Sequence, residues 1–186
     1  MPSNIHEHTE EILISESQLQ TRVKEIAGKI SRDYSDRAVM LIGVLKGSLI
    51  FVADLLRNIS GDVTADFICV SSYEGARSGG KIKLVMDVKE DLAGKHVLLV
   101  EDIVDTGATL AFLQELILAR RPASLRTCVL LDKFAARTVP VTIDYRGFSI
   151  PEKFIVGYGL DYRERYRGLP YIGVLRDEII QKGKEL

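Results

Sequence analysis

The sequence predicts an α/β domain whose parallel, twisted sheet is flanked by helices, with a small irregular hood lobe. Short apolar runs suited to buried strands lie at residues 38–44, 97–103 and 125–131. The first two runs are each followed by apolar residues at helical spacing, and this alternation is typical of βαβ units. From residue 139 onward the helical pattern stops, and strand-like runs separated by Gly and Pro predict the hood lobe.

Three helices are predicted along the chain. Ser15 and Gln18 form an S-x-x-Q capping box, and the apolar spacing that follows predicts an amphipathic helix over residues 16–31. Similar spacing predicts helices over residues 49–59 and 109–119. Each helix carries an apolar face that must pack on another element.

Further strands are predicted at residues 63–70 and 82–86, with a glycine-rich loop between them. Parallel sheets covered by helices bind ligands at the carboxyl ends of their strands. The turn at Lys46, the acidic residues after Val100 and the residue Lys133 all fall at such ends. These three places are therefore the candidates for a functional site.

The length of 186 residues suits one buried core, so we expect a single domain over residues 1–186. Its core is expected at about residues 35–138, and its hood from about residue 139 with part of the N-terminus. Apolar residues make up 46% of the chain and charged residues 27%, which is the balance of a globular protein. The net charge of −1 offers no basic excess for nucleic acid or an anionic membrane, and we expect neither as a partner.

Cysteine and histidine usage gives no sign of a structural metal or a disulfide framework. Cys69 and Cys128 lie in strand-like runs and are expected to be free core thiols, while His6 and His8 are expected in a solvated tail. The acidic N-terminal stretch does not resemble a secretory signal, and the longest apolar stretch is far below the roughly 20 residues of a membrane span. We therefore expect a cytoplasmic protein.

The strongest motif runs from Glu101 to Thr109, between a buried strand and a helix. Two adjacent carboxylates, Glu101 and Asp102, repel each other unless a cation or hydroxyl donors meet them, and Mg²⁺ or sugar hydroxyls fit that need. Thr106, Gly107, Ala108 and Thr109 supply amides, hydroxyls and the positive end of a helix dipole, which suit a phosphate group.

An alternative is that Asp105 or Thr106 only caps the helix and that the acidic pair lies in a solvated loop. Two other nucleotide sites are excluded, because the chain has neither a G-x-x-x-x-G-K-[ST] loop nor a G-x-G-x-x-G sequence after a strand.

The motif VLLVEDIVDTGATL at residues 97–110 resembles the phosphoribosyl pyrophosphate motif of the purine phosphoribosyltransferases, specifically the hypoxanthine-guanine type. The resemblance covers about residues 38–175 and includes GVLKGSLIF, SSYEGARSGGKIK, LLDK and IPEKFIVGYGLDYRERYRGLPYIGVL in that order. It implies the type I phosphoribosyltransferase fold.

The resemblance also implies a role for each site residue. Asp105 would be the general base that takes a proton from N7 of the purine. The implied ribose and 5′-phosphate contacts are Glu101, Asp102, Thr106, Gly107, Ala108 and Thr109; the implied metal ligands are Glu101, Asp102 and Asp161. The implied pyrophosphate contacts are Lys46, Gly47 and Arg167, with the Leu45–Lys46 peptide often cis in the family. Ser72 and Tyr73 would belong to a lid, and the implied purine contacts are Lys133, Phe154, Ile155 and Asp161.

Lys133 would read the O6 atom of the base and Phe154 would stack on its ring. Without the resemblance, Lys46 would be an ordinary exposed lysine, Phe154 a core residue and residues 163–167 a solvated charged run. Ala108 stands where some members carry Lys or Arg, which affects the expected phosphate affinity. Arg137 receives no role beyond its proximity to the site.

The implied reaction transfers phosphoribosyl from phosphoribosyl pyrophosphate to hypoxanthine or guanine, with Mg²⁺ bound mainly through the substrate. Relatives of this type are dimers or tetramers, so a homo-oligomer is expected. Two alternatives remain open: an enzyme for xanthine or another base, and a regulator that binds phosphoribosyl pyrophosphate without turnover.

Overall fold

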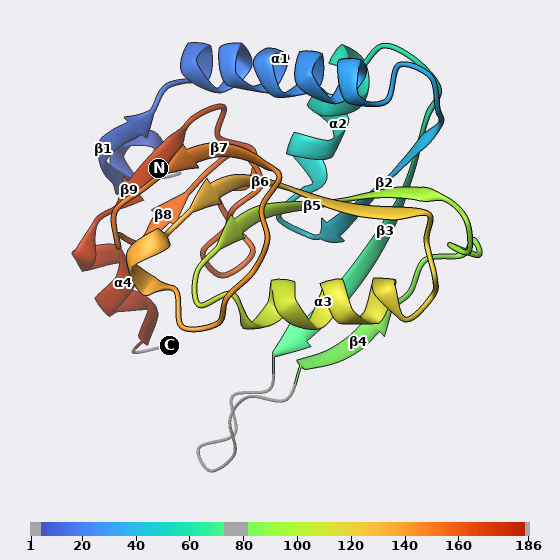
Figure 1. The fold of residues 1–186 in the computed structure, drawn as a ribbon. Helices are drawn as coiled ribbons and strands as arrows, with labels where there is room; N and C mark the ends of the chain where they lie inside the picture. Colours follow the sequence, from blue (N-terminus) through green and yellow to red (C-terminus); the bar gives the residue numbers. More distant parts are fainter. Residues whose placement is uncertain (1–4, 73–81, 185–186) are drawn as a thin grey trace.

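A six-stranded, mostly parallel sheet forms the centre of the molecule in the computed structural model, which describes residues 5–72 and 82–184 (Figure 1). Its strand order is β4-β3-β2-β5-β6-β7, and only β4 runs antiparallel to its neighbour. The strands are β2 (Val39–Leu45), β3 (Val63–Ser72), β4 (Ile82–Met86), β5 (His96–Val104), β6 (Ser124–Asp132) and β7 (Tyr145–Ser149). The predicted fold class is confirmed.

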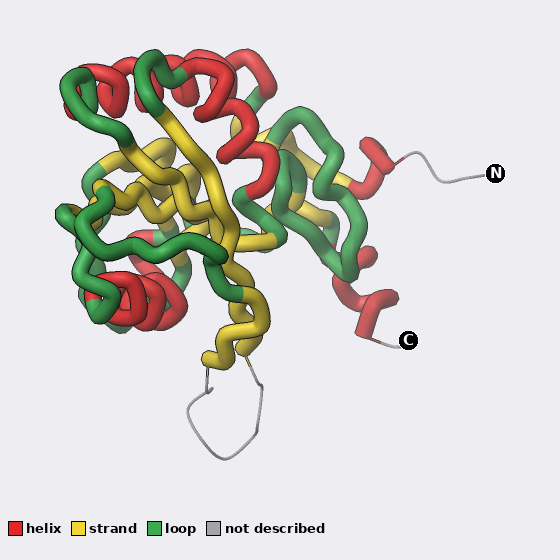
Figure 2. The backbone as a smooth tube through the Cα atoms, turned by 90° about the vertical axis from the view of Figure 1, so that its right-hand side faces the viewer, coloured by secondary structure: helices red, strands yellow, loops and turns green. Residues whose placement is uncertain are grey.

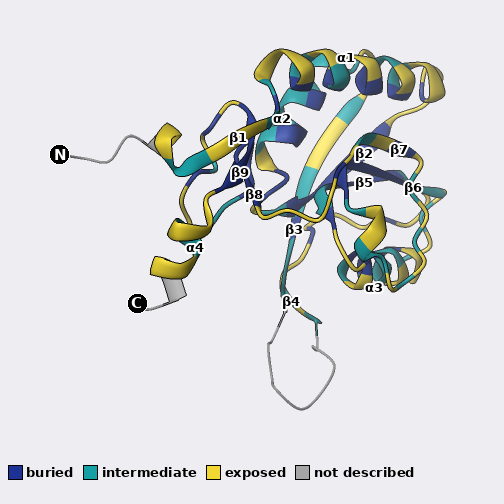
Figure 3. Cartoon of the chain, turned by 90° about the vertical axis from the view of Figure 1, so that its left-hand side faces the viewer, coloured by how far each residue is buried: buried dark blue, intermediate teal, exposed yellow. Residues whose placement is uncertain are grey.

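Helices cover both faces of this sheet. The helices α1 (Glu16–Asp33) and α2 (Leu49–Asn58) lie on one face, and α3 (Ala108–Leu118) lies on the other (Figure 1). Side chains alternate along a strand, so β5 sends Leu98 and Val100 into the core beneath α1 and α2, and Val97 and Leu99 into the core beneath α3. The two central strands, β2 and β5, are mostly buried (Figure 3).

The capping box at the start of α1 is confirmed. The Gln18 amide donates to Ser15 Oγ, and the Ser15 amide donates to the Gln18 side chain, so two free amides at the helix start are satisfied. The buried face of α1 consists of Leu19, Val23, Ile26, Ala27 and Ile30.

A separate three-stranded antiparallel sheet joins the two ends of the chain; we term this sheet, its connections and α4 the hood. The sheet order is β1-β9-β8, and the elements are η1 (Ile5–His8), β1 (Thr9–Ile14), β8 (Ile155–Val156), β9 (Ile172–Leu175) and α4 (Asp177–Lys184). Figure 2 shows the hood beside the layers of the main domain, with the first and last described helices, η1 and α4, in it. Among the described helices, none is long and apolar enough to span a membrane.

Several expectations need correction. The large sheet continues past residue 139, because β7 pairs in parallel with β6, and this long-range pairing leaves no signal in local sequence. The sequence predicted no helix after residue 139, but the helix α4 forms there. Its Ile179 and Ile180 pack against the buried apolar cluster of the hood, which consists of Val156, Tyr166, Leu169, Tyr171 and Leu175. A short 3-10 helix, η2 (Phe134–Ala136), follows β6.

The N-terminal histidines are part of the hood and not a solvated tail. His6 Nδ1 lies 2.9 Å from the Tyr171 hydroxyl, and His8 Nδ1 lies 2.8 Å from the Tyr166 hydroxyl. The tyrosines lie far along the chain, so sequence spacing alone could not reveal these contacts.

Candidate active site at the carboxyl ends of the central strands

The carboxyl ends of β2, β5 and β6 lie side by side, since β5 pairs in parallel with β2 on one side and β6 on the other. The candidate residues follow these ends directly: Lys46 after β2, Asp105 after β5 and Lys133 after β6. Three segments distant in sequence are thus brought to one edge, as predicted from the strand pattern.

Residues 105–109, which we term the phosphate loop, connect β5 to the start of α3. Gly107 has a φ of +92°, and a Cβ at this position would lie 2.6 Å from the Val139 carbonyl oxygen, so only glycine fits here. The Ala108 amide donates to Thr106 Oγ1 over 3.4 Å. A pocket of about 240 Å³ opens at this loop and is lined by Glu101, Ile103, Val104, Asp105, Thr106, Gly107, Thr109 and Leu110.

Glu101 is a buried carboxylate within this pocket. Burial raises the pKa of Glu101 well above its usual range, and the neighbouring charge of Asp102 raises it further. Its Oε2 atom has no hydrogen-bond partner among the described residues. Buried polar atoms are usually met by a hydrogen-bond donor or a cation, and the described residues supply neither for this oxygen.

Asp102 lies against a different set of neighbours. It faces Gly47, where a Cβ would come within 1.7 Å of Asp102 Oδ2. Burial raises the pKa of Asp102 to about 6, while two backbone amides and Arg167 oppose the shift and Asp161 adds to it. Because Glu101 and Asp102 are successive residues of β5, they contact opposite parts of the site, and the sequence interpretation as one acidic unit is refined accordingly.

An ion-pair cluster connects the turn after β2 to the hood. Lys46 Nζ lies 3.0 Å from Glu164, and Arg167 Nη2 lies 2.8 Å from Asp161 and 3.2 Å from Glu164. The hydrogen bond from Lys46, followed by the one from Arg167, lowers the pKa of Glu164. The peptide between Leu45 and Lys46 is cis, as the resemblance implied.

Sequence reasoning missed Glu164, which joins the two cations of this cluster. Its segment, residues 163–167, is the one that could have been a solvated charged run, and only its contacts with Lys46 and Arg167 distinguish it. The hood approaches the turn closely here, since a Cβ on Gly159 would lie 1.9 Å from the Gly47 carbonyl oxygen.

Asp105 and Lys133 face each other across the ends of β5 and β6. Lys133 Nζ lies 3.6 Å from Asp105 Oδ2, and the Lys133 side chain is 13% exposed against 55% for Asp105. The Lys133 amide also donates to the Val104 carbonyl oxygen over 2.9 Å. A carboxylate and an ammonium group are thereby placed together at the edge of the phosphate loop.

The proposed purine contacts come from different elements. Phe154 is 44% exposed and is not a core residue; its ring meets Tyr162 edge-on at a centroid distance of 5.3 Å. Ile155 is buried in β8. Ser72 ends β3, and Tyr73 lies outside the described residues, so the expected lid is not described.

Comparison with known proteins places the chain in a family. A family model for the phosphoribosyl transferase domain matches residues 9–163. The chain belongs to the phosphoribosyl transferase family. It is 44% identical over 169 residues to the hypoxanthine-guanine phosphoribosyltransferase of Streptococcus pneumoniae, covering 90% of this chain and 94% of that relative. A solved structure of Trypanosoma cruzi hypoxanthine phosphoribosyl transferase matches with a TM-score of 0.93 and 43% identity, covering 98% of this chain and 100% of that one.

Other relatives are longer proteins. The bifunctional protein TilS/HprT of Listeria innocua is 44% identical over 177 residues, which are 95% of this chain and 27% of that relative. The chain thus spans about a quarter of the length of such relatives. The resemblance to hypoxanthine-guanine phosphoribosyltransferases drawn from the sequence is confirmed.

Within this phosphoribosyl transferase fold, Arg137 gains contacts that sequence reasoning could not assign. Its Nε donates to the Asp105 carbonyl oxygen over 3.2 Å, and its guanidinium pairs with the buried carboxylate of Asp132. The available sequence signal was the charged residue Asp132, which directly follows the apolar run at residues 128–131 of β6.

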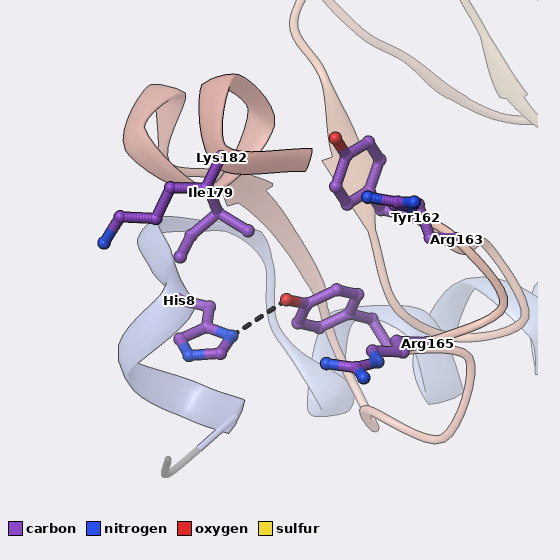
Figure 4. Close-up of a pocket in the computed structure, with 7 residues that line it drawn as sticks. His8, Tyr162, Arg163, Arg165, Ile179 and Lys182 are labelled. Carbon is purple, nitrogen blue, oxygen red and sulfur yellow. Dashed lines mark hydrogen bonds between the residues drawn. The ribbon is translucent and has the colours of Figure 1, made fainter. Parts of the chain in front are cut away.

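A second pocket, of about 370 Å³, lies in the hood, and no residue of the phosphate loop is part of its lining (Figure 4). It is lined by His8, Tyr162, Arg163, Arg165, Tyr166, Ile179 and Lys182. The dashed line in Figure 4 marks the bond between His8 and the Tyr166 hydroxyl that fixes the N-terminal segment to this lobe.

Proposed function

We propose that this chain transfers the 5-phosphoribosyl group of phosphoribosyl pyrophosphate to N9 of hypoxanthine or guanine. The products are IMP or GMP and pyrophosphate. The observation that carries the proposal is the ion pair of Asp105 with Lys133, which lies directly beside the phosphate-loop pocket. The hypoxanthine-guanine phosphoribosyltransferases among its relatives support the same activity.

In the proposed mechanism, Asp105 accepts the proton of purine N7 while N9 bonds to C1 of the ribose and the bond from C1 to pyrophosphate breaks. A positioned general base typically contributes about 10²- to 10⁴-fold to the rate. Lys133 donates a hydrogen bond to O6 of the base, which an adenine amino group could not accept. This contact favours 6-oxopurines over adenine.

The donor's 5′-phosphate would bind at residues 106–109, where the amides at the start of α3, the hydroxyls of Thr106 and Thr109 and the helix dipole converge. Ala108 adds no charge, so these groups carry more of the phosphate binding here. The pyrophosphate would meet Lys46, Gly47 and Arg167. Arg167 Nε supports this assignment, because it is a buried donor without an acceptor among the described residues.

The residues fit a Mg²⁺ ion that binds together with the donor. Carboxylate oxygens are the hard ligands that Mg²⁺ prefers. Glu101 offers its free Oε2 on one side of β5, whereas Asp102 and the nearby charge of Asp161 lie on the other side, so the three carboxylates do not form one ligand set. Among the described residues no group of three or more His, Cys, Asp or Glu side chains could hold a metal, so substrate oxygens would complete the coordination. Bound there, the ion would neutralise charge on the departing pyrophosphate.

Phe154 would stack on the purine ring, and main-chain atoms of Ile155 would contact the base beside it. The exposure of Phe154 at the hood supports this role, since an aromatic ring in the core could not meet a ligand. A homo-oligomer, either a dimer or a tetramer, and a cytoplasmic location are part of the same proposal.

The test is a base panel. Protein, Mg²⁺ and phosphoribosyl pyrophosphate are mixed with hypoxanthine, guanine, xanthine or adenine, and nucleotide formation is followed by chromatography. Turnover is expected with hypoxanthine and guanine and not with adenine. Turnover with xanthine alone would favour the xanthine type, and donor binding without turnover would favour a regulator.

A further inference from the structure

We propose that Arg137, anchored by the buried carboxylate of Asp132, is a positioning residue for Asp105. The inference rests on the proposed function, in which Asp105 accepts the purine proton. Arg137 Nε donates to the main-chain carbonyl oxygen of Asp105 over 3.2 Å, and Nη2 of the same guanidinium pairs with Asp132 Oδ1. One planar group thus joins the end of β6 to the loop after β5.

Asp132 can anchor Arg137 because it is fully buried and forms ion pairs with two arginines. A buried carboxylate is tolerated only when cations or donors meet it. Arg137 Nη2 donates a hydrogen bond to Asp132 Oδ1. Arg146 Nε on β7 lies 2.8 Å from Oδ2 as an ion pair without hydrogen-bond alignment. Asp132 is the last residue of β6, and its carbonyl oxygen accepts a hydrogen bond of 3.0 Å from the Ile150 amide just after β7.

The residues that follow Arg137 also hold the phosphate loop, at Thr106, the residue after Asp105. The amides of Thr138 and Val139 donate to the Thr106 carbonyl oxygen over 3.0 and 2.9 Å. The stem of Arg137 passes directly beside Gly107, where a Cβ would come within 2.8 Å of Arg137 Cδ. Residues 137–139 therefore donate hydrogen bonds to the carbonyl oxygens of the first two residues of the phosphate loop, Asp105 and Thr106.

This support matters because the Asp105 side chain is itself weakly held. It is more than half exposed, and its described ion pair with Lys133 is 3.6 Å long. The backbone therefore sets where the carboxylate can reach, and Arg137 fixes that backbone. A misplacement of about 1 Å at a reacting group can reduce a rate by about 10²-fold.

Arg146 provides a matched control. It pairs with the same carboxylate as Arg137, but it does so from β7, and its side chain is about half exposed. Loss of either arginine removes one cation from Asp132. Among the described contacts, only the loss of Arg137 also frees the Asp105 carbonyl.

The experiment measures kcat and KM for hypoxanthine in the wild type, Arg137→Gln, Arg146→Gln, Asp105→Asn and the double variant Asp105→Asn with Arg137→Gln. We expect Arg137→Gln to lower kcat by about 10- to 100-fold and Arg146→Gln by less than about 3-fold. In the Asp105→Asn background, Arg137→Gln should cost less than about 2-fold, since residues that act as a unit are not additive.

Two results would overturn the proposal. Equal losses from the two arginine variants would assign the effect to the Asp132 anchor alone, and full additivity with Asp105→Asn would mean that Arg137 acts elsewhere. If Arg137→Gln does not fold, Arg137→Lys carries the test, because an ammonium can pair with Asp132 but cannot extend a planar fork to Asp105. Normal melting with reduced kcat in that variant supports positioning, and normal kcat contradicts it. A wild type without turnover would reject the proposed function itself, and this inference with it.

Discussion

The phosphate loop and the ion-pair cluster of the hood lie at the same sheet edge, yet they are assembled differently. The phosphate loop is a contiguous stretch, residues 105–109, shaped by a left-handed glycine and the start of a helix. The cluster joins Lys46 from the turn after β2 to Glu164 and Arg167 from the hood. The first region depends on backbone geometry, whereas the second depends on charged side chains that are partly exposed.

This difference predicts unequal sensitivity to substitution. Substitutions in the phosphate loop should lower activity strongly, because small displacements of groups that the backbone holds in place remove their function. Exposed ion pairs each contribute little to stability, so substitutions in the ion-pair cluster should have smaller effects.

Asp105→Asn tests the phosphate-loop region. The amide cannot accept the purine proton, so kcat should fall by about 10²-fold or more while the affinity for phosphoribosyl pyrophosphate changes by less than about 3-fold. Steady-state kinetics and calorimetric titration with the donor measure the two quantities. Asp62→Asn, at an exposed position far from the site in sequence, serves as the control. Near-normal kcat would remove Asp105 as the base.

Asp102→Asn tests the residue of β5 that lies between the two regions, and its effect is on the free energy of unfolding. Burial raises the pKa of Asp102 from 3.8 to about 6, so the folded protein binds a proton that the unfolded chain releases between these pH values. The free energy of unfolding therefore falls as pH rises from about 4 to about 6, by a limit of about 3 kcal/mol for a shift of about two units.

An asparagine at position 102 stays neutral, so the free energy of unfolding of the variant does not fall with pH through this residue. The variant should thus be more stable than the wild type at pH 8 and indistinguishable from it near pH 4, as measured by urea unfolding at each pH. The control Asp62→Asn should match the wild type at both pH values. A stability difference that does not change with pH would contradict the assignment.

Glu164→Gln tests the ion-pair cluster and should have the smallest effect. Glu164 pairs with Lys46 and with Arg167. Its neutralisation removes one negative charge and frees Lys46 from this ion pair, while Arg167 keeps its ion pair with Asp161. Pyrophosphate should inhibit the variant more strongly, by up to about 5-fold, with the gain reduced by salt. Product-inhibition kinetics measure this change, and Glu152→Gln at an exposed hood position is the control. Weaker inhibition would mean that Glu164 mainly orients the cations.

Local patterns predicted most of the elements because each leaves a nearby signal. The capping box at Ser15 marked the start of α1 to the residue, and the apolar runs marked β2, β5 and β6. The pairing of β7 with β6 and the attachment of His6 and His8 to the hood were not predictable, since these contacts join residues far apart in the chain.

The α/β class, the loop at residues 105–109 and the residues at the strand ends were predictable from the sequence, because periodicity and a contiguous motif are local properties. Only the folded structure shows that Glu101 and Asp102 face different neighbours and that Glu164 joins Lys46 to Arg167. The same holds for the hydrogen bonds that connect Arg137 to Asp132 and to the Asp105 carbonyl. The physical reason is that burial and ion pairing depend on which distant segments the folded chain brings into contact, and a linear sequence does not contain those distances.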